Sequence, residues 1–138
     1  MPARDIYHDT VVQALVADGW TITGDPLRLS FGARDFYVDL AAELPIAAER
    51  GGQRIAVEVK SFVGASNIRE LELAVGQFAL YREVLARSEP GRILYMAVSI
   101  TIQETLFEEP IGRLMIETQS LRMLVFDPTK GRIAKWIP

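Results

Sequence analysis

The strongest constraint on the fold is a short apolar run, Ile55-Ala56-Val57-Glu58-Val59-Lys60, which carries an acid and a base two positions apart. In a β-strand, residues i and i+2 point to the same face of the sheet. The run therefore predicts a strand in which Glu58 and Lys60 project together while the branched apolar residues pack on the opposite face. Paired charges on an otherwise apolar strand make this a candidate functional site.

The segment Asp35–Leu40 alternates between polar and apolar residues, which predicts a second strand. Its apolar residues would share one face and Asp39 would lie on the other. A glycine pair at 51–52 predicts a turn into the strand at 53–61, so antiparallel pairing of the two strands is expected. This pairing would bring Asp39 close to Glu58.

The remaining elements predict a mixed sheet flanked by helices. Apolar residues recur at helical spacing in residues 3–18 and 66–87. The nearly apolar run at 93–100 suits a strand that is covered on both faces. Further helices are expected at 101–107 and 110–119, and further strands at 20–23, 27–31, 121–126 and 132–137. This order favours an α/β fold of the mixed-sheet α+β kind, in a single domain over residues 1–138.

Composition excludes several kinds of site. The chain has no cysteine and a single histidine, His8, so disulfides, thiolate zinc sites and multi-histidine metal sites are absent. The formal net charge of −3 argues against strong sequence-independent binding of nucleic acid, which rests on lysine and arginine contacts to phosphates. A role on DNA would therefore need a metal ion, a local basic patch or a partner protein.

No run of apolar residues approaches the roughly 18 that a membrane span requires. The first residues also lack the long apolar stretch of a signal peptide. We therefore expect no membrane association, and the absence of cysteine suits a reducing, cytoplasmic setting.

The predicted cluster has the chemistry of a metal-dependent phosphodiesterase. Mg²⁺ or Mn²⁺ prefers hard oxygen ligands, which the carboxylates of Asp39 and Glu58 and the carbonyl of Val59 could supply. Such an ion activates a water molecule and stabilises negative charge at phosphorus. Lys60 could orient that water or hold the phosphate. Two acids and a lysine in this order are typical of nucleases of the PD-(D/E)xK type.

Other candidates each have two interpretations. Gln77, on the predicted helix at 66–87, either lies near the phosphate or is a solvated helix position. Asp9 is either an additional site acid on the first helix or a surface residue whose charge suits the helix start. His8 is expected to be a hydrogen-bonded structural residue rather than a base. Glu58 and Lys60 could themselves be charges on the wet face of an antiparallel strand.

The acidic stretch Glu108-Glu109-Pro110 predicts a helix boundary. Large apolar residues flank it on both sides. They could form an exposed docking surface, although core packing is the favoured interpretation. These residues are Leu106, Phe107, Ile111 and Leu114.

Several segments, taken in order, resemble the XisH family. They are ARDIYHD at 3–9, DGW at 18–20, DPL at 25–27, YVDL at 37–40, IAVEVKSF at 55–62, GQ at 76–77, FEEPIG at 107–112, VFDP at 125–128 and WIP at 136–138. The resemblance implies an fdxN element excision controlling factor of cyanobacteria, acting in DNA rearrangement during heterocyst differentiation. It also implies a restriction-endonuclease-like core, a small companion protein, XisI, and a separate site-specific recombinase that excises the element.

Three functions follow as hypotheses. The first is an accessory factor for DNA excision on a PD-(D/E)xK nuclease fold, which binds a partner protein and, in one version, DNA. The second is an active Mg²⁺-dependent endonuclease that uses Asp39, Glu58 and Lys60, with Gln77 and Asp9 as further candidates. The third is a protein-interaction module without catalysis. Whether the chain forms a homo-oligomer is left open.

Overall fold

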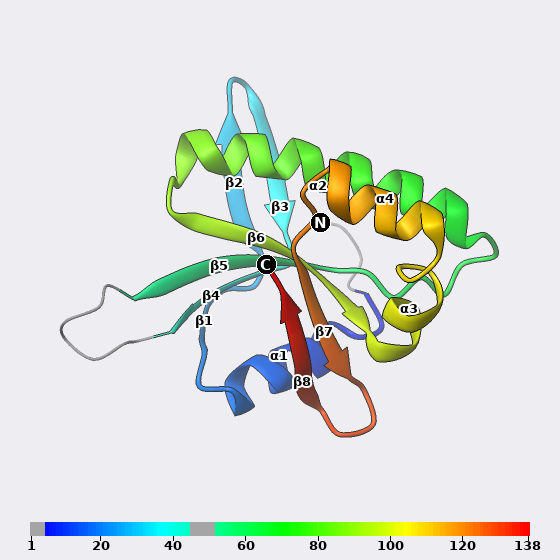
Figure 1. Ribbon diagram of the computed structural model, residues 1–138. Coiled ribbons are helices and arrows are strands. Elements are labelled where there is room, and N and C mark those ends of the chain that lie inside the picture. Colours follow the sequence, from blue (N-terminus) through cyan, green and yellow to red (C-terminus); the bar gives the residue numbers. More distant parts are fainter. Residues whose placement is uncertain (1–4, 45–51) are drawn as a thin grey trace.

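A mixed β-sheet forms the centre of the computed structural model, which describes residues 5–44 and 52–138 (Figure 1). Six strands lie in the order β1-β4-β5-β6-β7-β8. They are β1 (Thr21–Gly24), β4 (Leu40–Leu44), β5 (Gln53–Val59), β6 (Arg92–Ser99), β7 (Met123–Asp127) and β8 (Arg132–Ile137). β5, β6 and β7 are mutually parallel, and the other neighbours pair antiparallel. The predicted mixed sheet is confirmed.

Helices cover both faces of this sheet (Figure 1). They are α1 (His8–Ala17), α2 (Asn67–Ser88), α3 (Ile100–Thr105) and α4 (Pro110–Thr118). One core lies under α2, where Leu71, Phe78 and Leu85 pack against the sheet. The second core lies on the opposite face, where Val11 and Leu15 of α1 pack against it. The first residues of the predicted helix at 3–18 and residue 51 of the predicted turn lie outside the described residues.

β5 is buried on both faces, and its residues divide between the two cores. Ile55, Val57 and Val59 join the core under α1, whereas Ala56 joins the core under α2. Glu58 follows Ala56 on the second face, where it is 7% exposed. The alternation expected from the sequence is thus confirmed, but Glu58 lies under a helix and not on a wet face.

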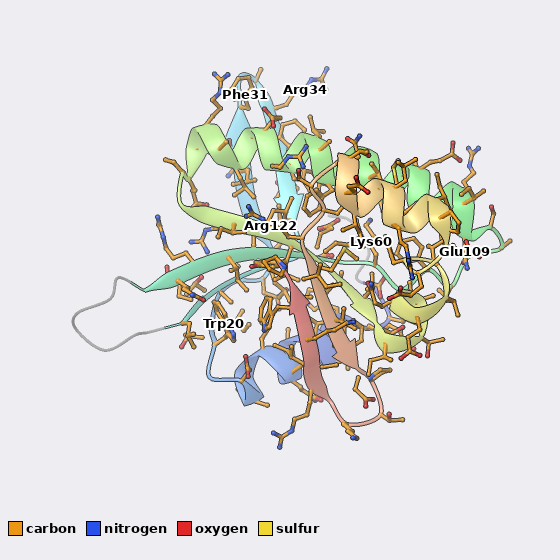
Figure 2. The ribbon with its side chains drawn as sticks, in the orientation of Figure 1. Trp20, Phe31, Arg34, Lys60, Glu109 and Arg122 are labelled. Atoms are coloured by element: carbon orange, nitrogen blue, oxygen red, sulfur yellow. The ribbon has the colours of Figure 1, made fainter. Side chains whose placement is uncertain are left out.

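The prediction of one continuous strand over Asp35–Leu40 is wrong. β3 (Arg34–Val38) leaves the main sheet and forms a hairpin with β2 (Leu27–Phe31), and β4 begins only at Leu40. The hairpin tip, with Phe31 and Arg34, stands away from the sheet (Figure 2). β4, rather than the whole segment, pairs antiparallel with β5. The strand is thus interrupted at Asp39, between β3 and β4.

Hydrogen bonds to side chains explain this break. The N–H of Asp39 donates to the Glu58 carboxylate, and the Asp39 carboxylate accepts from the N–H of Val59. Both bonds take the place of backbone ladder bonds at this point. Val38 and Leu40 therefore lie in different cores and do not share one face as the alternation suggested.

α2 begins at Asn67 because Ser66 caps it. The Ser66 hydroxyl oxygen accepts from the N–H of Arg69 at 3.2 Å, which satisfies one of the free N–H groups of the first turn.

No helix in the described residues is both long enough and apolar enough to cross a bilayer.

Candidate functional site

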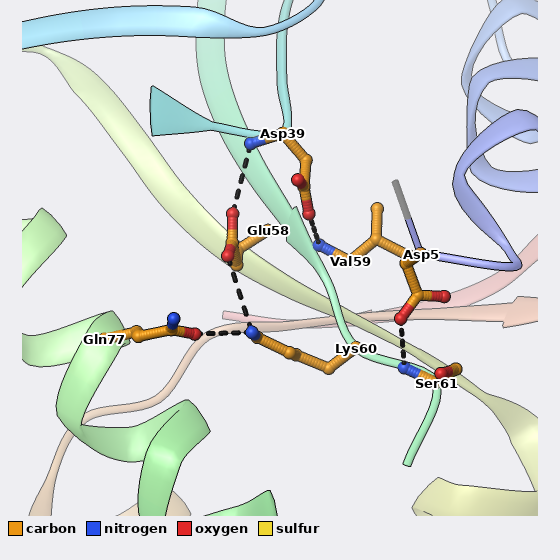
Figure 3. Close-up of polar contacts among 7 residues, drawn as sticks. All are labelled: Asp5, Asp39, Glu58, Val59, Lys60, Ser61 and Gln77. Atoms are coloured by element: carbon orange, nitrogen blue, oxygen red, sulfur yellow. Dashed lines mark hydrogen bonds and ion pairs between the residues drawn. The ribbon is translucent and has the colours of Figure 1, made fainter. Parts of the chain in front are cut away.

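Two carboxylates converge where the chain passes from β3 to β4 and where β5 ends (Figure 3). The N–H of Asp39 donates to Glu58 Oε1 at 3.1 Å, and the N–H of Val59 donates to Asp39 Oδ2 at 2.8 Å. Each carboxylate is thus held by one backbone N–H through one oxygen. The second oxygens, Asp39 Oδ1 and Glu58 Oε2, are not engaged by these two backbone bonds.

Lys60 and Gln77 complete this cluster (Figure 3). The Lys60 ammonium lies 3.6 Å from Glu58 Oε2 and donates a hydrogen bond to Gln77 Oε1. Gln77 reaches the cluster from α2, so the helix and the strand together fix the ammonium. The structure therefore brings together four of the residues that the sequence singled out. They are Asp39, Glu58, Lys60 and Gln77.

Burial and mutual repulsion keep the two acids from ionising easily. Burial, followed by repulsion from the Asp39 carboxylate, raises the pKa of Glu58 to about 7, although the Lys60 ammonium opposes the shift. Burial also raises the pKa of Asp39, against the hydrogen bond from Val59 and the charges of His8 and Lys60. A bound cation would relieve this repulsion.

The raised pKa of Glu58 predicts that stability falls as pH rises. Between pH 4.5 and about 7, Glu58 loses its proton in the unfolded chain while the folded protein keeps it. Folding is therefore favoured at the acidic end, and up to roughly 3 kcal/mol is lost across this window. Urea denaturation in EDTA should show that the free energy of unfolding falls across this pH window, and Glu58→Gln should remove most of this pH dependence. An identical pH dependence in the variant would contradict the raised pKa of Glu58.

Asp5 is a site residue that the sequence did not reveal. Its Oδ1 accepts from the N–H of Tyr7 at 2.9 Å. Its Oδ2 accepts from the N–H of Ser61 at 3.0 Å, the bond drawn in Figure 3. Asp5 thus ties the start of α1 to the backbone directly after Lys60. Because the helix was expected to begin at residue 3, Asp5 had no distinct position within it.

We expect Asp5→Ala to destabilise the protein by about 1–3 kcal/mol, because the buried N–H of Ser61 would lose its acceptor. Asp5→Asn keeps one acceptor oxygen and should cost less. Thermal or urea unfolding of both variants measures this difference. Equal stability of Asp5→Ala and wild type would contradict the role of Asp5.

Asp9 and His8, the other two candidates at the start of α1, differ in their surroundings. Asp9 is exposed in the first turn of α1, and the acid that bonds the loop after Lys60 is Asp5. His8 is 3% exposed, with Nε2 2.7 Å from Asp25 Oδ1, as expected of a hydrogen-bonded structural residue.

Tyr81, one turn after Gln77 on α2, interacts electrostatically with the two acids. Burial, followed by the charges of Glu58 and Asp39, raises its pKa. The sequence feature that could have identified Tyr81 is its spacing of four residues from Gln77, because residues i and i+4 share one side of a helix.

The oxygens present fit a hard divalent cation. In the described ranges 5–44 and 52–138, no group of three or more His, Asp or Glu side chains is arranged to hold a metal ion. Mg²⁺ usually needs only one or two carboxylates and keeps water or phosphate oxygens in its other positions. The Val59 N–H donates to Asp39, and because the N–H and carbonyl of one strand residue lie on the same side, we expect the Val59 carbonyl beside Asp39. The carboxylates of Asp39 and Glu58 are oxygen donors of the kind that such an ion prefers.

This chain is similar to known proteins over nearly its whole length. Residues 1–134 match the family described as XisH protein. A crystal structure of an XisH family protein from Nostoc punctiforme PCC 73102 superposes with a TM-score of 0.88 at 41% identity, covering 97% of this chain and 100% of that one. The crystal structure of an fdxN element excision controlling factor protein from Anabaena variabilis gives a TM-score of 0.88 at 43% identity, covering 98% and 100%. No curated protein matches the sequence. The chain belongs to the XisH family.

Proposed function

We propose that this protein is an accessory factor in the controlled excision of a DNA element and that its carboxylate site binds a divalent metal ion and a DNA phosphate. The name of the Anabaena variabilis relative, an fdxN element excision controlling factor, supports the role in excision. The main observation in support of the proposed metal site is the convergence of Asp39, Glu58 and Lys60 at the end of β5. This convergence also supports a restriction-endonuclease-like, PD-(D/E)xK core.

Each residue has a distinct role in this proposal. Asp39 and Glu58 would hold Mg²⁺ or Mn²⁺, and the Val59 carbonyl would be a further ligand. The ion, when bound, polarises the phosphate and lowers the pKa of a coordinated water. Lys60 binds a phosphate oxygen or orients the water, and Gln77 holds the Lys60 ammonium in place.

One observation favours a second function, Mg²⁺-dependent cleavage of DNA. The Lys60 ammonium is positioned in advance, 3.6 Å from a ligand carboxylate and fixed by Gln77. DNA binding alone needs only a flexible surface lysine, whereas hydrolysis benefits from an ammonium that is already in place. The accessory factor and the endonuclease therefore share one site and differ in whether it turns over.

The acidic chain supports dependence on partners. With a net charge of −3, the protein has little general attraction for DNA phosphates. We propose that XisI and a site-specific recombinase act with it during heterocyst-type differentiation, as the family resemblance implies. These partners would bring the DNA to the carboxylate site.

A cleavage assay separates the two functions. The protein, with and without XisI, is incubated with duplex, branched and single-stranded DNA in Mg²⁺ or Mn²⁺, alongside Asp39→Ala and Lys60→Ala. Metal-dependent cleavage that both substitutions abolish would establish the endonuclease. Cleavage that survives both would refute the site. Metal binding without cleavage would support the accessory role, and the absence of both would leave an interaction module.

A further inference from the structure

The apolar residues around Glu108–Pro110 divide between the core and the surface. Leu106 and Phe107 are buried, as the core-packing interpretation predicts, whereas Ile111 and Leu114 of α4 are exposed. Exposed leucines also occur on α2, where the charges around them indicate what covers them.

The outward side of α2 carries a row of exposed residues. α2 lies across the outside of the sheet (Figure 1). Leu73 of this helix is 60% exposed and Leu80 is 48% exposed, although both are large apolar side chains. Together with Arg69, Gly76 and Glu83, which are also exposed, they recur at spacings of four, three, four and three residues. Such spacings keep to one side of a helix, so these five residues form one line, the outer row of α2.

Gly76 lies at the centre of the outer row and leaves it open. A Cβ placed on Gly76 would meet nothing within 4 Å, so the fold itself does not require glycine here. Glycine in a helix interior costs roughly 0.5–1 kcal/mol relative to alanine. Glycine also allows the backbone of another segment to approach closely. Gly76 is therefore a suitable point for a second helix to cross α2.

The two ends of the outer row carry opposite charges at equal distances from Gly76. Arg69 lies seven residues before Gly76, and Glu83 lies seven residues after it. Within the described residues, no ion pair engages Arg69. Glu83 Oε2 lies 3.8 Å from Nε of Arg82, and the Glu83 side chain is 78% exposed, so it can accept a further partner.

We propose that two copies of this chain pair through the outer rows of α2, antiparallel, about a two-fold axis at Gly76. A two-fold interface requires a surface that complements itself. The outer row does so, because Arg69 would face Glu83 of the partner subunit at both ends. Between them, Leu73 would pack against Leu80 of the partner subunit, which removes apolar surface from water. Gln77 of the same helix holds Lys60, so the axis would also relate the two carboxylate sites.

Charge reversal tests this pairing, with sedimentation equilibrium as the measurement of the dimer dissociation constant. Arg69→Glu alone and Glu83→Arg alone each bring like charges together and should weaken the dimer by a factor of about 10 or more. The double variant restores opposite charges and should return to within about 3-fold of wild type. An equimolar mixture of the two single variants should form a heterodimer, because opposite charges again meet at both ends.

Three further variants complete the test. Gly76→Met should weaken the dimer about 10-fold or more, because its side chain keeps the two helices apart. Arg132→Glu makes the same change of charge at an exposed residue of β8 and should leave the dimer unaltered. Asp39→Asn should also dimerise as wild type does, so loss of the metal site and loss of the dimer are distinguishable.

The proposal is wrong if the wild-type protein is a monomer at all concentrations up to about 1 mM, because even weak interfaces associate there. It is also wrong if the double variant dimerises no better than the single variants. Equal weakening by Arg132→Glu and Arg69→Glu would likewise overturn it, since net charge and not the outer row would then govern association.

Discussion

Replacing Asp39 with asparagine is expected to weaken Mn²⁺ binding by a factor on the order of 100 or more, because one of the two proposed carboxylate ligands loses its charge. The fold should persist, since the asparagine amide oxygen can still accept from the N–H of Val59. Isothermal titration calorimetry with Mn²⁺ measures the loss. The pKa of Glu58 should fall in the same variant, because repulsion from Asp39 is one cause of its rise.

Asp35→Asn is the matched control. Asp35 is an exposed carboxylate on β3 that bonds Arg28 at 2.9 Å and lies outside the cluster, so the same change of charge should leave Mn²⁺ affinity unaltered. Equal loss in both variants would show that overall charge, and not the site, governs binding. Unchanged affinity in Asp39→Asn would remove Asp39 from the ligand set.

Replacing Gly112 with alanine is expected to destabilise the protein by about 3 kcal/mol or more. A Cβ at Gly112 would lie 2.2 Å from the carbonyl oxygen of Leu106 and 2.5 Å from Cα of Phe107. Both are backbone atoms, so relief requires α4 to move away from the turn that precedes it, and overpacking of this kind is costly. Urea denaturation compares the free energies of unfolding.

Gly76→Ala is the matched substitution with the opposite sign. Because its Cβ meets open space in a helix interior, it should stabilise the protein by roughly 0.5–1 kcal/mol. The same chemical change should thus destabilise at α4 and stabilise at α2. If Gly112→Ala were as stable as wild type, the close contact between α4 and the preceding turn would be wrong.

Local patterns predicted the apolar strand and the helix that carries Gln77, because their signals lie within a few residues. Alternation alone placed Glu58, at the end of β5, and Lys60, directly after it, on one side of the chain, and helical spacing placed Leu71 and Phe78 in the core. Such periodicities follow from backbone geometry and need no knowledge of distant contacts.

Contacts between distant residues could not be predicted in this way. The break at Asp39 depends on its hydrogen bond with Val59, 20 residues away, and the bond from Ser61 to Asp5 spans 56 residues. No residue near Asp39 marks the end of a strand. The alternation of polar and apolar residues therefore predicted one continuous strand through Asp39. The choice of Asp9 over Asp5 on the first helix has the same origin, because only the folded chain shows which acid meets Ser61.

We propose that Asp39 and Glu58 share one metal ion beside Lys60. Crystals soaked in Mn²⁺ test it directly through an anomalous difference map. We expect one peak about 2.1 Å from Asp39 Oδ1 and from Glu58 Oε2. An occupied Mn²⁺ position elsewhere, with these two carboxylates bare, would contradict it.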